Sequence, residues 1–295
     1  MSKKYTADEY ILMINNALMS RLSVEPSVAG EAKMLEAMRY SVENGGKRIR
    51  PMLTLEFCRM CGGSVEAALP LACAIEFIHT YSLIHDDLPC MDDDGMRRGK
   101  PSSHIKFGEA NALLAGDSLL TFAFQSAGEA EDTPADAVAK AVSLLARASG
   151  CAGMIAGQVQ DLENENKTVA ADDLRSVDIL KTGELIRCAC QLGCIAAGAD
   201  DKKLEAARVY AENLGIAFQI VDDILDVTSD EATLGKPVGS DAENCKNTYV
   251  SLLGLEEAKK IAAELTRKAI DALGVFGGES EFLVSLSKKL LSRNK

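Results

Sequence analysis

The stretch between Pro134 and Pro237 contains no proline, and this long run constrains the fold more than any other feature of the sequence. Proline breaks helix interiors, so a run without it can hold several uninterrupted helices. Apolar side chains recur within it at the spacing of an α-helix. From Leu204 onward they are Val209, Leu214, Phe218, Val221 and Leu225. Because alternating strand-like segments are hard to find, the sequence predicts an all-α fold.

Further helices are expected over residues 136–147 and 256–273, which carry the same periodicity. Clusters of glycine and proline separate the apolar segments, as is typical of helix boundaries. They stand at residues 45–46, 61–63, 99–101, 132–134 and 277–278. The chain has 295 residues and no low-complexity linker. We therefore expect a single domain over residues 1–295, built from about ten helices.

The charge balance disfavours a nucleic-acid-binding protein, because 44 acidic residues outnumber 32 Lys and Arg and the formal net charge is −12. The N-terminal segment lacks the apolar core of a signal peptide, and no long apolar stretch is free of charge. We expect a cytoplasmic protein without a membrane span. The nine cysteines are expected to be reduced and packed as small hydrophobic residues.

Two acidic clusters lie in apolar segments. The first, DDLPCMDDD at residues 86–94, follows the apolar run 72–85, and the second, DDILD at residues 222–226, lies inside the run 214–227. On a helix, Asp222 and Asp226 are four residues apart and share one face. Pro89 is expected to end or bend the first helix, so that the later carboxylates fold back toward it.

Carboxylates in such a setting need cationic partners, because like charges repel and a partly buried ionised group is costly unless paired. Mg²⁺ prefers oxygen ligands and commonly bridges carboxylates to substrate phosphates. An EF-hand calcium loop is excluded, since neither cluster has its alternating ligands and central glycine. The alternative interpretation is two solvated acidic helix ends, which the apolar setting of both clusters disfavours. The sequence therefore predicts a magnesium site that receives phosphate groups.

Basic residues gather near the acidic clusters. GGKRIRP at residues 45–51 is a compact cationic turn, and Arg97 and Arg98 follow the first cluster. Lys181, Lys236 and Lys246 are further candidates. Arginine presents a planar fork to phosphate oxygens, whereas lysine acts as a point charge. Together with the acidic clusters, these residues indicate a site for more than one diphosphate.

These motifs occur in a recognisable order: GGKRIRP, DDLPCMDDD with MRRGKP behind it, KTGEL, FQIVDDILD and LGKPVGSD. In this order the chain resembles the trans-isoprenyl diphosphate synthase family over nearly its whole length. The resemblance implies an all-α bundle around a deep central cavity, usually in a homodimer. It also implies an enzyme that joins isopentenyl diphosphate to an allylic diphosphate with three Mg²⁺ ions.

The resemblance assigns roles to individual residues. The Mg²⁺ ligands at the allylic diphosphate are Asp86, Asp87 and Asp92, and those of the remaining Mg²⁺ are Asp222 and Asp223, supported by Asp226. The allylic diphosphate is held by Arg97, Lys181 and Lys236, and isopentenyl diphosphate by Lys47, Arg50, His79 and Arg98. Oxygen dipoles stabilise the carbocation at Lys181, Thr182 and Gln219, and Lys246 matches a lysine near the closed site.

Product length is expected to depend on Tyr81 and Ser82, which stand five and four residues before Asp86. Helical rise places Tyr81 about 7.5 Å from the metal cluster, where its ring would form the floor of the chain pocket. This pair resembles bacterial farnesyl diphosphate synthases, which extend dimethylallyl or geranyl diphosphate to the C15 product. The alternatives are a geranylgeranyl (C20) synthase, a terpene cyclase, or a non-catalytic subunit of a heteromeric synthase. For Tyr81 itself, the alternative interpretation is ordinary core packing.

Overall fold

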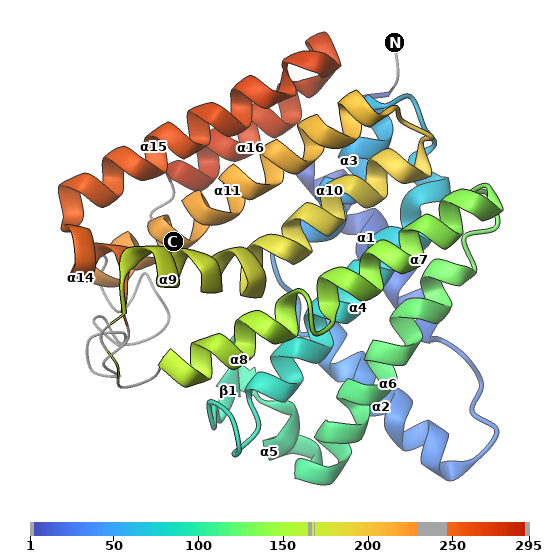
Figure 1. Cartoon of the computed structure of the whole chain (residues 1–295). Helices are drawn as coiled ribbons and strands as arrows, with labels where there is room; N and C mark the ends of the chain where they lie inside the picture. Colours follow the sequence, from blue (N-terminus) through green and yellow to red (C-terminus); the bar gives the residue numbers. More distant parts are fainter. Residues whose placement is uncertain (1–2, 165–166, 168, 229–246, 293–295) are drawn as a thin grey trace. The chain divides into compact units, whose positions relative to one another are not determined.

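The structure is a computed structural model that describes residues 3–164, 167, 169–228 and 247–292 (Figure 1). The chain forms two compact units. Unit 1 comprises Met1–Leu145 and Leu192–Gly198, and unit 2 comprises Ala146–Gln191 and Ala199–Lys295. Helices dominate both units, which confirms the all-α prediction. The expectation of a single domain around a central cavity stays a prediction.

Unit 1 is built around the helix that ends in the first acidic cluster. Its elements are α1 (Ala7–Leu22), α2 (Ala29–Glu43), α3 (Ile49–Met60), α4 (Val65–Asp86), β1 (Met96–Arg97), β2 (Lys100–Pro101), α5 (Ser103–Phe107), α6 (Glu109–Gly128) and most of α7 (Ala135–Ser149). Helix α4 packs against α3 and α6. Most of its side chains are buried, so it forms the core of this unit.

Local signals fix both ends of α4. Ser64 caps its N-terminus, because the Ser64 hydroxyl accepts a hydrogen bond from the Ala67 N–H at 3.1 Å. Pro70 lies inside the helix, and its carbonyl accepts a hydrogen bond from the Ser126 hydroxyl of α6 at 2.8 Å. The helix ends at Asp86, three residues before Pro89. The expectation that Pro89 ends this helix is confirmed.

A two-stranded hairpin follows the acidic cluster, and the sequence patterns did not predict it. Met96 pairs with Pro101 and Arg97 with Lys100, so Arg98 and Gly99 form the turn. Both turn residues have positive φ, 53° and 78°. Positive φ at both central positions is typical of a type I′ turn, whose twist matches that of the strands. Two residues per strand are too few to produce a periodic pattern, and for this reason the sequence did not predict the hairpin.

Unit 2 contains the second acidic cluster. Its elements are α8 (Met154–Asn164), α9 (Ala171–Asp178), η1 (Ile179–Gly183), most of α10 (Glu184–Ala196), α11 (Asp201–Thr228), α14 (Tyr249–Leu253), α15 (Leu255–Ala272), η2 (Leu273–Ser280) and α16 (Glu281–Leu291). Helices α11 and α15 pack together, and apolar side chains of both form a core cluster. Of the predicted α11 face, Leu214, Val221 and Leu225 are buried, whereas Val209 and Phe218 are half-buried.

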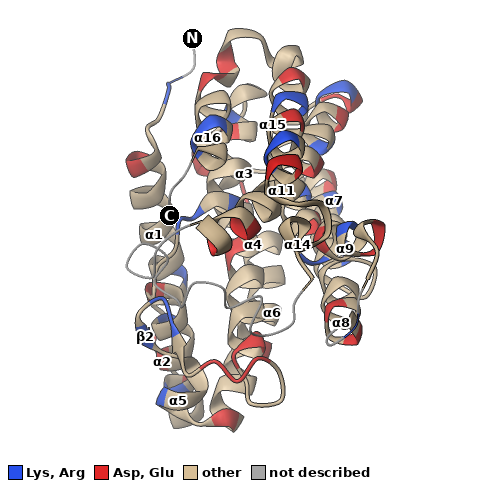
Figure 2. Cartoon of the chain, turned by 90° about the vertical axis from the view of Figure 1, so that its left-hand side faces the viewer, with Lys and Arg blue, Asp and Glu red and all other residues tan. Residues whose placement is uncertain are grey.

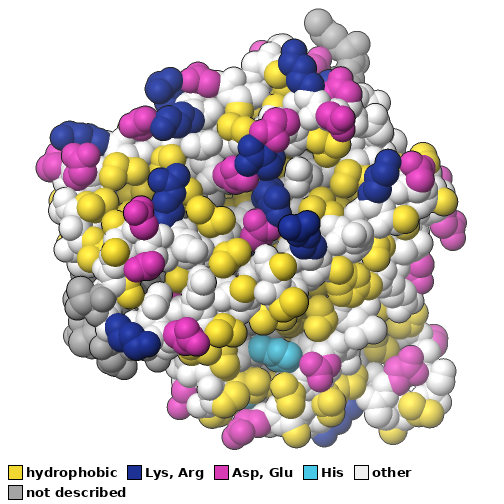
Figure 3. Space-filling model, in the orientation of Figure 1, with side chains coloured by type: hydrophobic (Ala, Val, Ile, Leu, Met, Phe, Trp, Pro, Cys, Tyr) yellow, Lys and Arg dark blue, Asp and Glu magenta, His cyan; other side chains and the backbone are white. Residues whose placement is uncertain are grey.

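The two shorter helix predictions are also confirmed. Residues 136–147 lie inside α7, and residues 256–273 coincide with α15 up to Ala272, after which the chain continues as the 3₁₀ segment η2. Gly277, in the predicted break at 277–278, has a positive φ of 61°. Charged side chains of both signs are interspersed on the face shown in Figure 3, as expected for amphipathic helices with solvated outer faces.

Within the described residues, two segments are long and apolar enough to cross a membrane by length and composition alone. The first is α4, in which 72% of the 18-residue apolar window is buried, as in a core helix. The second spans residues 135–164, where a turn at residues 150–153 separates α7, of 15 residues, from α8, of 11 residues. A span needs about 20 residues. The absence of a membrane span stays a prediction.

The cysteine prediction is confirmed in part. The eight described cysteines are free thiols, and five of them are buried. Burial raises the pKa of Cys58 to about 12, so its thiol stays protonated near neutral pH. Cys90 and Cys151 are exposed, so the expectation of buried packing is wrong for these two residues. Both lie in turns, where the chain offers no apolar face to cover them.

Candidate functional site

The first acidic cluster folds back on the end of α4. The Asp92 N–H donates a hydrogen bond to the carbonyl oxygen of Asp86 at 2.9 Å, and the Leu88 carbonyl accepts from the Asp93 N–H at 3.2 Å. Asp86 is half-buried and Asp92 is exposed. This compact turn confirms that the later carboxylates return toward the helix.

Asp87 behaves differently from its neighbours. Its side chain is only 3% exposed and accepts hydrogen bonds from the guanidinium of Arg97, with the Nε–Oδ1 distance 2.8 Å. Burial raises the pKa of Asp87, although the hydrogen bond and charge of Arg97 act to lower it. Arg97 also contacts Asp94 at 2.9 Å. The β1–β2 hairpin is thereby tied to the end of α4. Figure 2 colours the basic residues at the labelled strand β2 blue.

Arg98, in the hairpin turn, approaches the glycine turn before α3. A Cβ atom on Gly46 would lie 2.8 Å from the Arg98 guanidinium carbon, and Gly46 has a φ of 135°. The positive φ favours glycine at this position, whereas the guanidinium is the flexible end of the Arg98 side chain and can move aside. The predicted cationic turn and Arg98 therefore lie close together at Gly46.

Arg50 and His79 belong to the same positively charged surroundings. Burial and then the charge of Arg98 lower the pKa of Arg50, while Glu76 acts in the opposite direction. The buried Arg50 Nε has no hydrogen-bond partner among the described residues. Burial lowers the pKa of His79 well below its usual value, and Arg50 and Arg98 lower it further. A buried guanidinium nitrogen without a hydrogen-bond partner favours an anion beside it.

Not every basic residue of the glycine turn belongs to this site. Lys47 is exposed, whereas Arg48 is 4% exposed and pairs with Glu76 of α4 at 2.6 Å. Arg48 also donates a hydrogen bond to the Val42 carbonyl at 2.6 Å. The middle cation of this motif therefore stabilises the fold. A narrow pocket in unit 1 is lined by Tyr40, Asn44, Thr80, Asp87, Arg97 and Arg98 among others.

Tyr81 is 5% exposed on α4, one turn before His85. The two rings meet edge to face, with centroids 5.6 Å apart. Burial and the charge of Asp86 raise the pKa of Tyr81 to about 12. Its buried hydroxyl has no hydrogen-bond partner among the described residues. Ser82 is half-buried and donates to the His79 carbonyl at 3.0 Å.

In unit 2, the second acidic cluster lies on α11 as predicted. Asp222 and Asp223 are half-buried, and Asp226 is 3% exposed. The Asp223 carboxylate accepts a hydrogen bond from the Tyr249 N–H at 2.7 Å. Tyr249 is the first residue of α14, so a carboxylate binds at the start of that short helix.

Lys181 and Thr182 lie in the π-helical turn η1. The Lys181 Nζ contacts the Asp161 carboxylate of α8 at 2.6 Å. Helix α8 approaches closely because residue 157 is glycine: a Cβ atom there would lie 2.3 Å from the Lys181 backbone nitrogen. A single π turn inside a helix often marks a functional position.

Asp178 is a buried carboxyl group that the motifs did not indicate. It lies beside Gln219 and Tyr249, and burial raises its pKa to about 7 although both neighbours act to lower it. Nothing in its sequence surroundings, RSVDILK, distinguishes it from a solvated helix-end aspartate. Its burial arises from packing between α9, α11 and α14, which sequence reasoning did not supply.

Replacement of Asp178 by asparagine is expected to raise the melting temperature, and more at about pH 8 than at about pH 5. The unfolded chain loses this proton near about pH 4, whereas the folded chain keeps it up to about pH 7. The natural chain therefore loses stability as the pH rises between these values, and the neutral amide does not. Thermal unfolding at both pH values measures the difference. Asp136→Asn, on the exposed face of α7, is the control, and an equal gain at both pH values contradicts the prediction.

Two predicted residues, Lys236 and Lys246, lie outside the described residues. Within the described part of the chain, no three Asp, Glu, His or Cys side chains form a ready cluster for a metal ion. The assignment of Asp86, Asp87, Asp92, Asp222, Asp223 and Asp226 as ligands stays a prediction.

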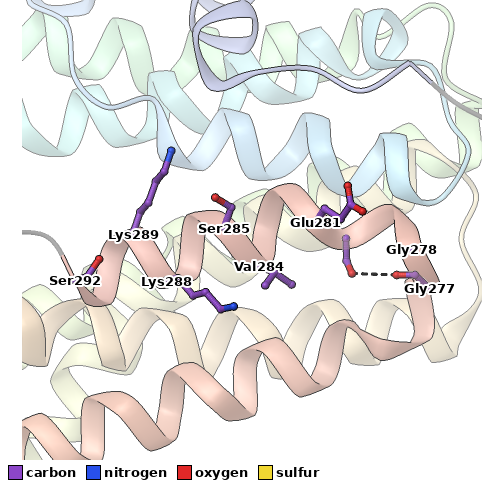
Figure 4. Close-up of a pocket in the computed structure, with 9 residues that line it drawn as sticks. Gly277, Gly278, Glu281, Val284, Ser285, Lys288, Lys289 and Ser292 are labelled. Atoms are coloured by element: carbon purple, nitrogen blue, oxygen red, sulfur yellow. Dashed lines mark hydrogen bonds between the residues drawn. The ribbon is translucent and has the colours of Figure 1, made fainter.

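A second pocket, of about 450 Å³, lies along η2 and α16 in unit 2 (Figure 4). Lys288 and Lys289 diverge from adjacent positions of the helix, and the Ser280 hydroxyl donates to the Gly277 carbonyl at 3.1 Å. Its lining residues include none of the motif residues.

Comparison with known proteins identifies the family. Residues 31–273 match the polyprenyl synthetase family. The farnesyl diphosphate synthase of Geobacillus stearothermophilus is 50% identical over 78% of each chain, and the geranylgeranyl diphosphate synthase of Cyanophora paradoxa is 44% identical over 88% of this chain and 87% of its own. The structure of an FPP/GFPP synthase from Zymomonas mobilis superposes with a TM-score of 0.86, at 37% identity over 97% of both chains. This chain therefore belongs to the polyprenyl synthetase family of trans-prenyltransferases, and it has their all-α fold.

Proposed function

We propose that this chain condenses isopentenyl diphosphate with dimethylallyl and then geranyl diphosphate to give farnesyl diphosphate. The observation that carries the proposal is the assembly at the end of α4. There the turn that carries Asp92 folds back on the backbone of Asp86, and a pocket is lined by Asp87, Arg97 and Arg98. The buried Arg50 Nε has no hydrogen-bond partner among the described residues. Carboxylates beside cations suit a substrate whose diphosphate is bound partly through metal ions.

The isopentenyl diphosphate is assigned to Lys47, Arg50, His79 and Arg98. The charge of Arg98 lowers the pKa of Arg50, and a diphosphate between the two side chains would offset this repulsion. His79, whose pKa is lowered, remains neutral and offers a ring N–H donor. Arg97 and Lys181 are assigned to the allylic diphosphate. The carboxylates of Asp87 and Asp161 now hold their side chains in place.

The residues fit magnesium in their chemistry. All six assigned ligands are carboxylates, which are hard oxygen donors, and Mg²⁺ usually combines one or two of them with water and substrate phosphates. A preformed cluster of three protein ligands is therefore not required. Three Mg²⁺ ions are expected, and when bound they would neutralise charge on the departing diphosphate.

Residues of the chain would guide each step of the reaction. The allylic C–O bond breaks, and Arg97 and Lys181 hold the diphosphate that leaves with the electron pair. The double bond of isopentenyl diphosphate attacks the carbocation and forms the new C–C bond, while oxygen dipoles at Lys181, Thr182 and Gln219 stabilise the positive charge. A proton is then lost to the released diphosphate. Apolar walls exclude water from the cation.

Geranylgeranyl diphosphate is the second candidate product, since relatives with both product names resemble this chain. The buried ring of Tyr81, five residues before Asp86, favours the C15 product. A non-catalytic role is disfavoured because both acidic clusters are intact. We further expect a homodimer, as the family resemblance implies, and a cytoplasmic location, as the sequence features described above indicate.

The function is tested by incubating the purified chain with Mg²⁺, isopentenyl diphosphate and dimethylallyl diphosphate, and then sizing the dephosphorylated products by chromatography. A C15 alcohol as the main product is expected. A C20 main product would replace the proposed product and leave the reaction class intact. Full condensation in EDTA would overturn the metal-dependent mechanism.

Replacement of Arg98 by glutamine is expected to raise the KM for isopentenyl diphosphate by about 10- to 100-fold, the value of a hydrogen bond to a charged group. The KM for the allylic substrate should change much less. Steady-state kinetics with each substrate varied in turn measures both. Lys100→Gln, in the same hairpin and also exposed, is the matched control. A defect confined to the allylic substrate would reverse the two assignments.

Replacement of Tyr81 by alanine is expected to shift the product toward C20 or longer, because removal of the ring deepens the pocket. The change also costs about 3–5 kcal/mol of stability, so folding must be verified by circular dichroism. Tyr81→Phe keeps the ring and loses only the unpartnered hydroxyl, so its product should remain C15. An unchanged product from folded Tyr81→Ala would reject Tyr81 as the floor.

A further inference from the structure

His85 has no part in the reaction described above, yet three described contacts fix its position. It lies four residues after Tyr81 on α4, so the two side chains share a face of the helix. The rings meet edge to face, with an interplanar angle of 77° and centroids 5.6 Å apart. This arrangement is one that aromatic pairs favour. The His85 ring therefore limits the directions in which the Tyr81 ring can tilt.

The second contact joins His85 to α6. Its Nε2 lies 3.0 Å from the carbonyl oxygen of Leu113. A carbonyl oxygen only accepts hydrogen bonds, so Nε2 carries the proton and donates. The Leu113 oxygen has two lone pairs and can accept this bond within the helix. The Asp117 carboxylate, one turn further along α6, lies 4.0 Å from the same nitrogen.

The third contact is the position of Gly116. A Cβ atom on Gly116 would lie 2.1 Å from His85 Nε2 and 2.4 Å from Cδ2. Both distances are far below van der Waals contact, so any side chain at position 116 would displace the ring. Gly116 is helical, with no positive φ that would require glycine for the backbone. The absence of a side chain at position 116 therefore leaves room for the imidazole ring of His85.

From these contacts we infer that His85 is a positioning residue for product length: seated on Gly116 and bound to Leu113, it braces the ring of Tyr81. The inference rests on the proposed role of Tyr81 as the floor of the chain pocket. It adds that this floor depends on four residues, Tyr81 and His85 of α4 together with Leu113 and Gly116 of α6. Without the brace, the tyrosine ring can tilt into the vacated space, and a longer chain can enter.

The expected effect is a change in product ratio. Loss of an edge-to-face contact should raise the ratio of C20 to C15 product by about twofold to tenfold. His85→Ala removes both the ring and its hydrogen bond, and His85→Asn removes the ring while keeping a short donor. The ratio should rise in both variants, so the inference remains testable if one of them fails to fold.

The decisive experiment combines His85→Ala with Tyr81→Ala. If His85 acts through Tyr81, the double variant should give the same product ratio as Tyr81→Ala alone, because no ring remains to brace. A further increase in the double variant would overturn the inference, as would a change in total turnover without a change in ratio. Suppose that Tyr81→Ala shifts the ratio of C20 to C15 product and His85→Ala does not. The inference about His85 would then be overturned, whereas the proposed role of Tyr81 as the floor would stand. An unchanged ratio in Tyr81→Ala would overturn both.

Gly116 offers an independent test on α6. Gly116→Ala should displace the imidazole ring and change the product ratio without altering either aromatic residue. Gly128→Ala, at the end of the same helix, is the matched control, because a Cβ atom there would meet nothing within 4 Å. If both variants were folded and gave equal product ratios, the proposed role of Gly116 in positioning the His85 ring would be overturned.

Discussion

Replacement of Asp86 by alanine should lower the turnover of the condensation by about 10²- to 10³-fold, the range typical of losing one group that stabilises developing charge. Asp86 is the last residue of α4, and the returning turn brings Asp92 to its backbone. Its carboxylate is therefore well placed to bind a metal ion that holds the diphosphate. Turnover at saturating substrate and Mg²⁺ measures the effect, and circular dichroism should show unchanged helical content.

The control for this prediction lies in the same turn. Asp93 is exposed and has a positive φ of 52°, which asparagine tolerates as well as aspartate does. Asp93→Asn should therefore keep near-normal turnover while removing one charge from the cluster. If both variants lost activity equally, the cluster would act through its total charge, and the specific role of Asp86 would be rejected.

Periodicity predicted the helices well because burial of one face determines where a helix forms. The α11 prediction succeeded since its apolar side chains follow the helical repeat up to the DDILD cluster, and α7 and α15 followed the same rule. The end of α4 was also predictable, because Pro89 cannot continue a helix. In each case the signal lies in residues that are close together in the sequence, so the sequence alone predicts the element.

The site was less predictable where distant segments decide the outcome. The approach of Arg98 to Gly46 depends on a hairpin of two-residue strands, which leaves no pattern in the sequence. Asp178 is buried by three helices, and its neighbour Tyr249 lies 71 positions away in numbering (249 − 178). The sequence patterns assigned no role to His85. Its imidazole ring nevertheless lies so close to Gly116 that a Cβ atom there would be 2.1 Å from Nε2, one of the shortest such distances in unit 1.

Arg48 shows the same difficulty within one motif. In GGKRIRP the three cations look equivalent, but Arg48 adopts a left-handed backbone conformation with φ 48° just before α3 begins. This reversal turns its side chain inward, where it meets Glu76 of α4 at 2.6 Å, and both side chains are 3% exposed. A buried pair of this kind is costly to break, because removal of one partner leaves the other charge unpaired away from water.

Replacement of Arg48 by methionine should therefore lower the free energy of unfolding by about 3–5 kcal/mol. The chain offers a control with the same geometry: Arg208 and Glu212 of α11 are also 2.6 Å apart, but their side chains are 35% and 36% exposed. Arg208→Met should cost less than about 1 kcal/mol, since water screens both charges. Urea unfolding measures the free energy of unfolding of the two variants. It thereby compares a buried and a half-exposed ion pair with the same N–O distance.

A second variant separates the ion pair from the packing of the arginine stem. Arg48→Met combined with Glu76→Leu removes both charges, so the unpaired carboxylate that makes the single variant unstable no longer exists. The double variant should recover part of the loss, but not all of it, because the Val42 carbonyl and Asn15 still lose the hydrogen bonds that Arg48 donates. If the double variant were less stable than Arg48→Met alone, the lost packing and hydrogen bonds would account for the effect. The buried charge of Glu76 would then not be its cause.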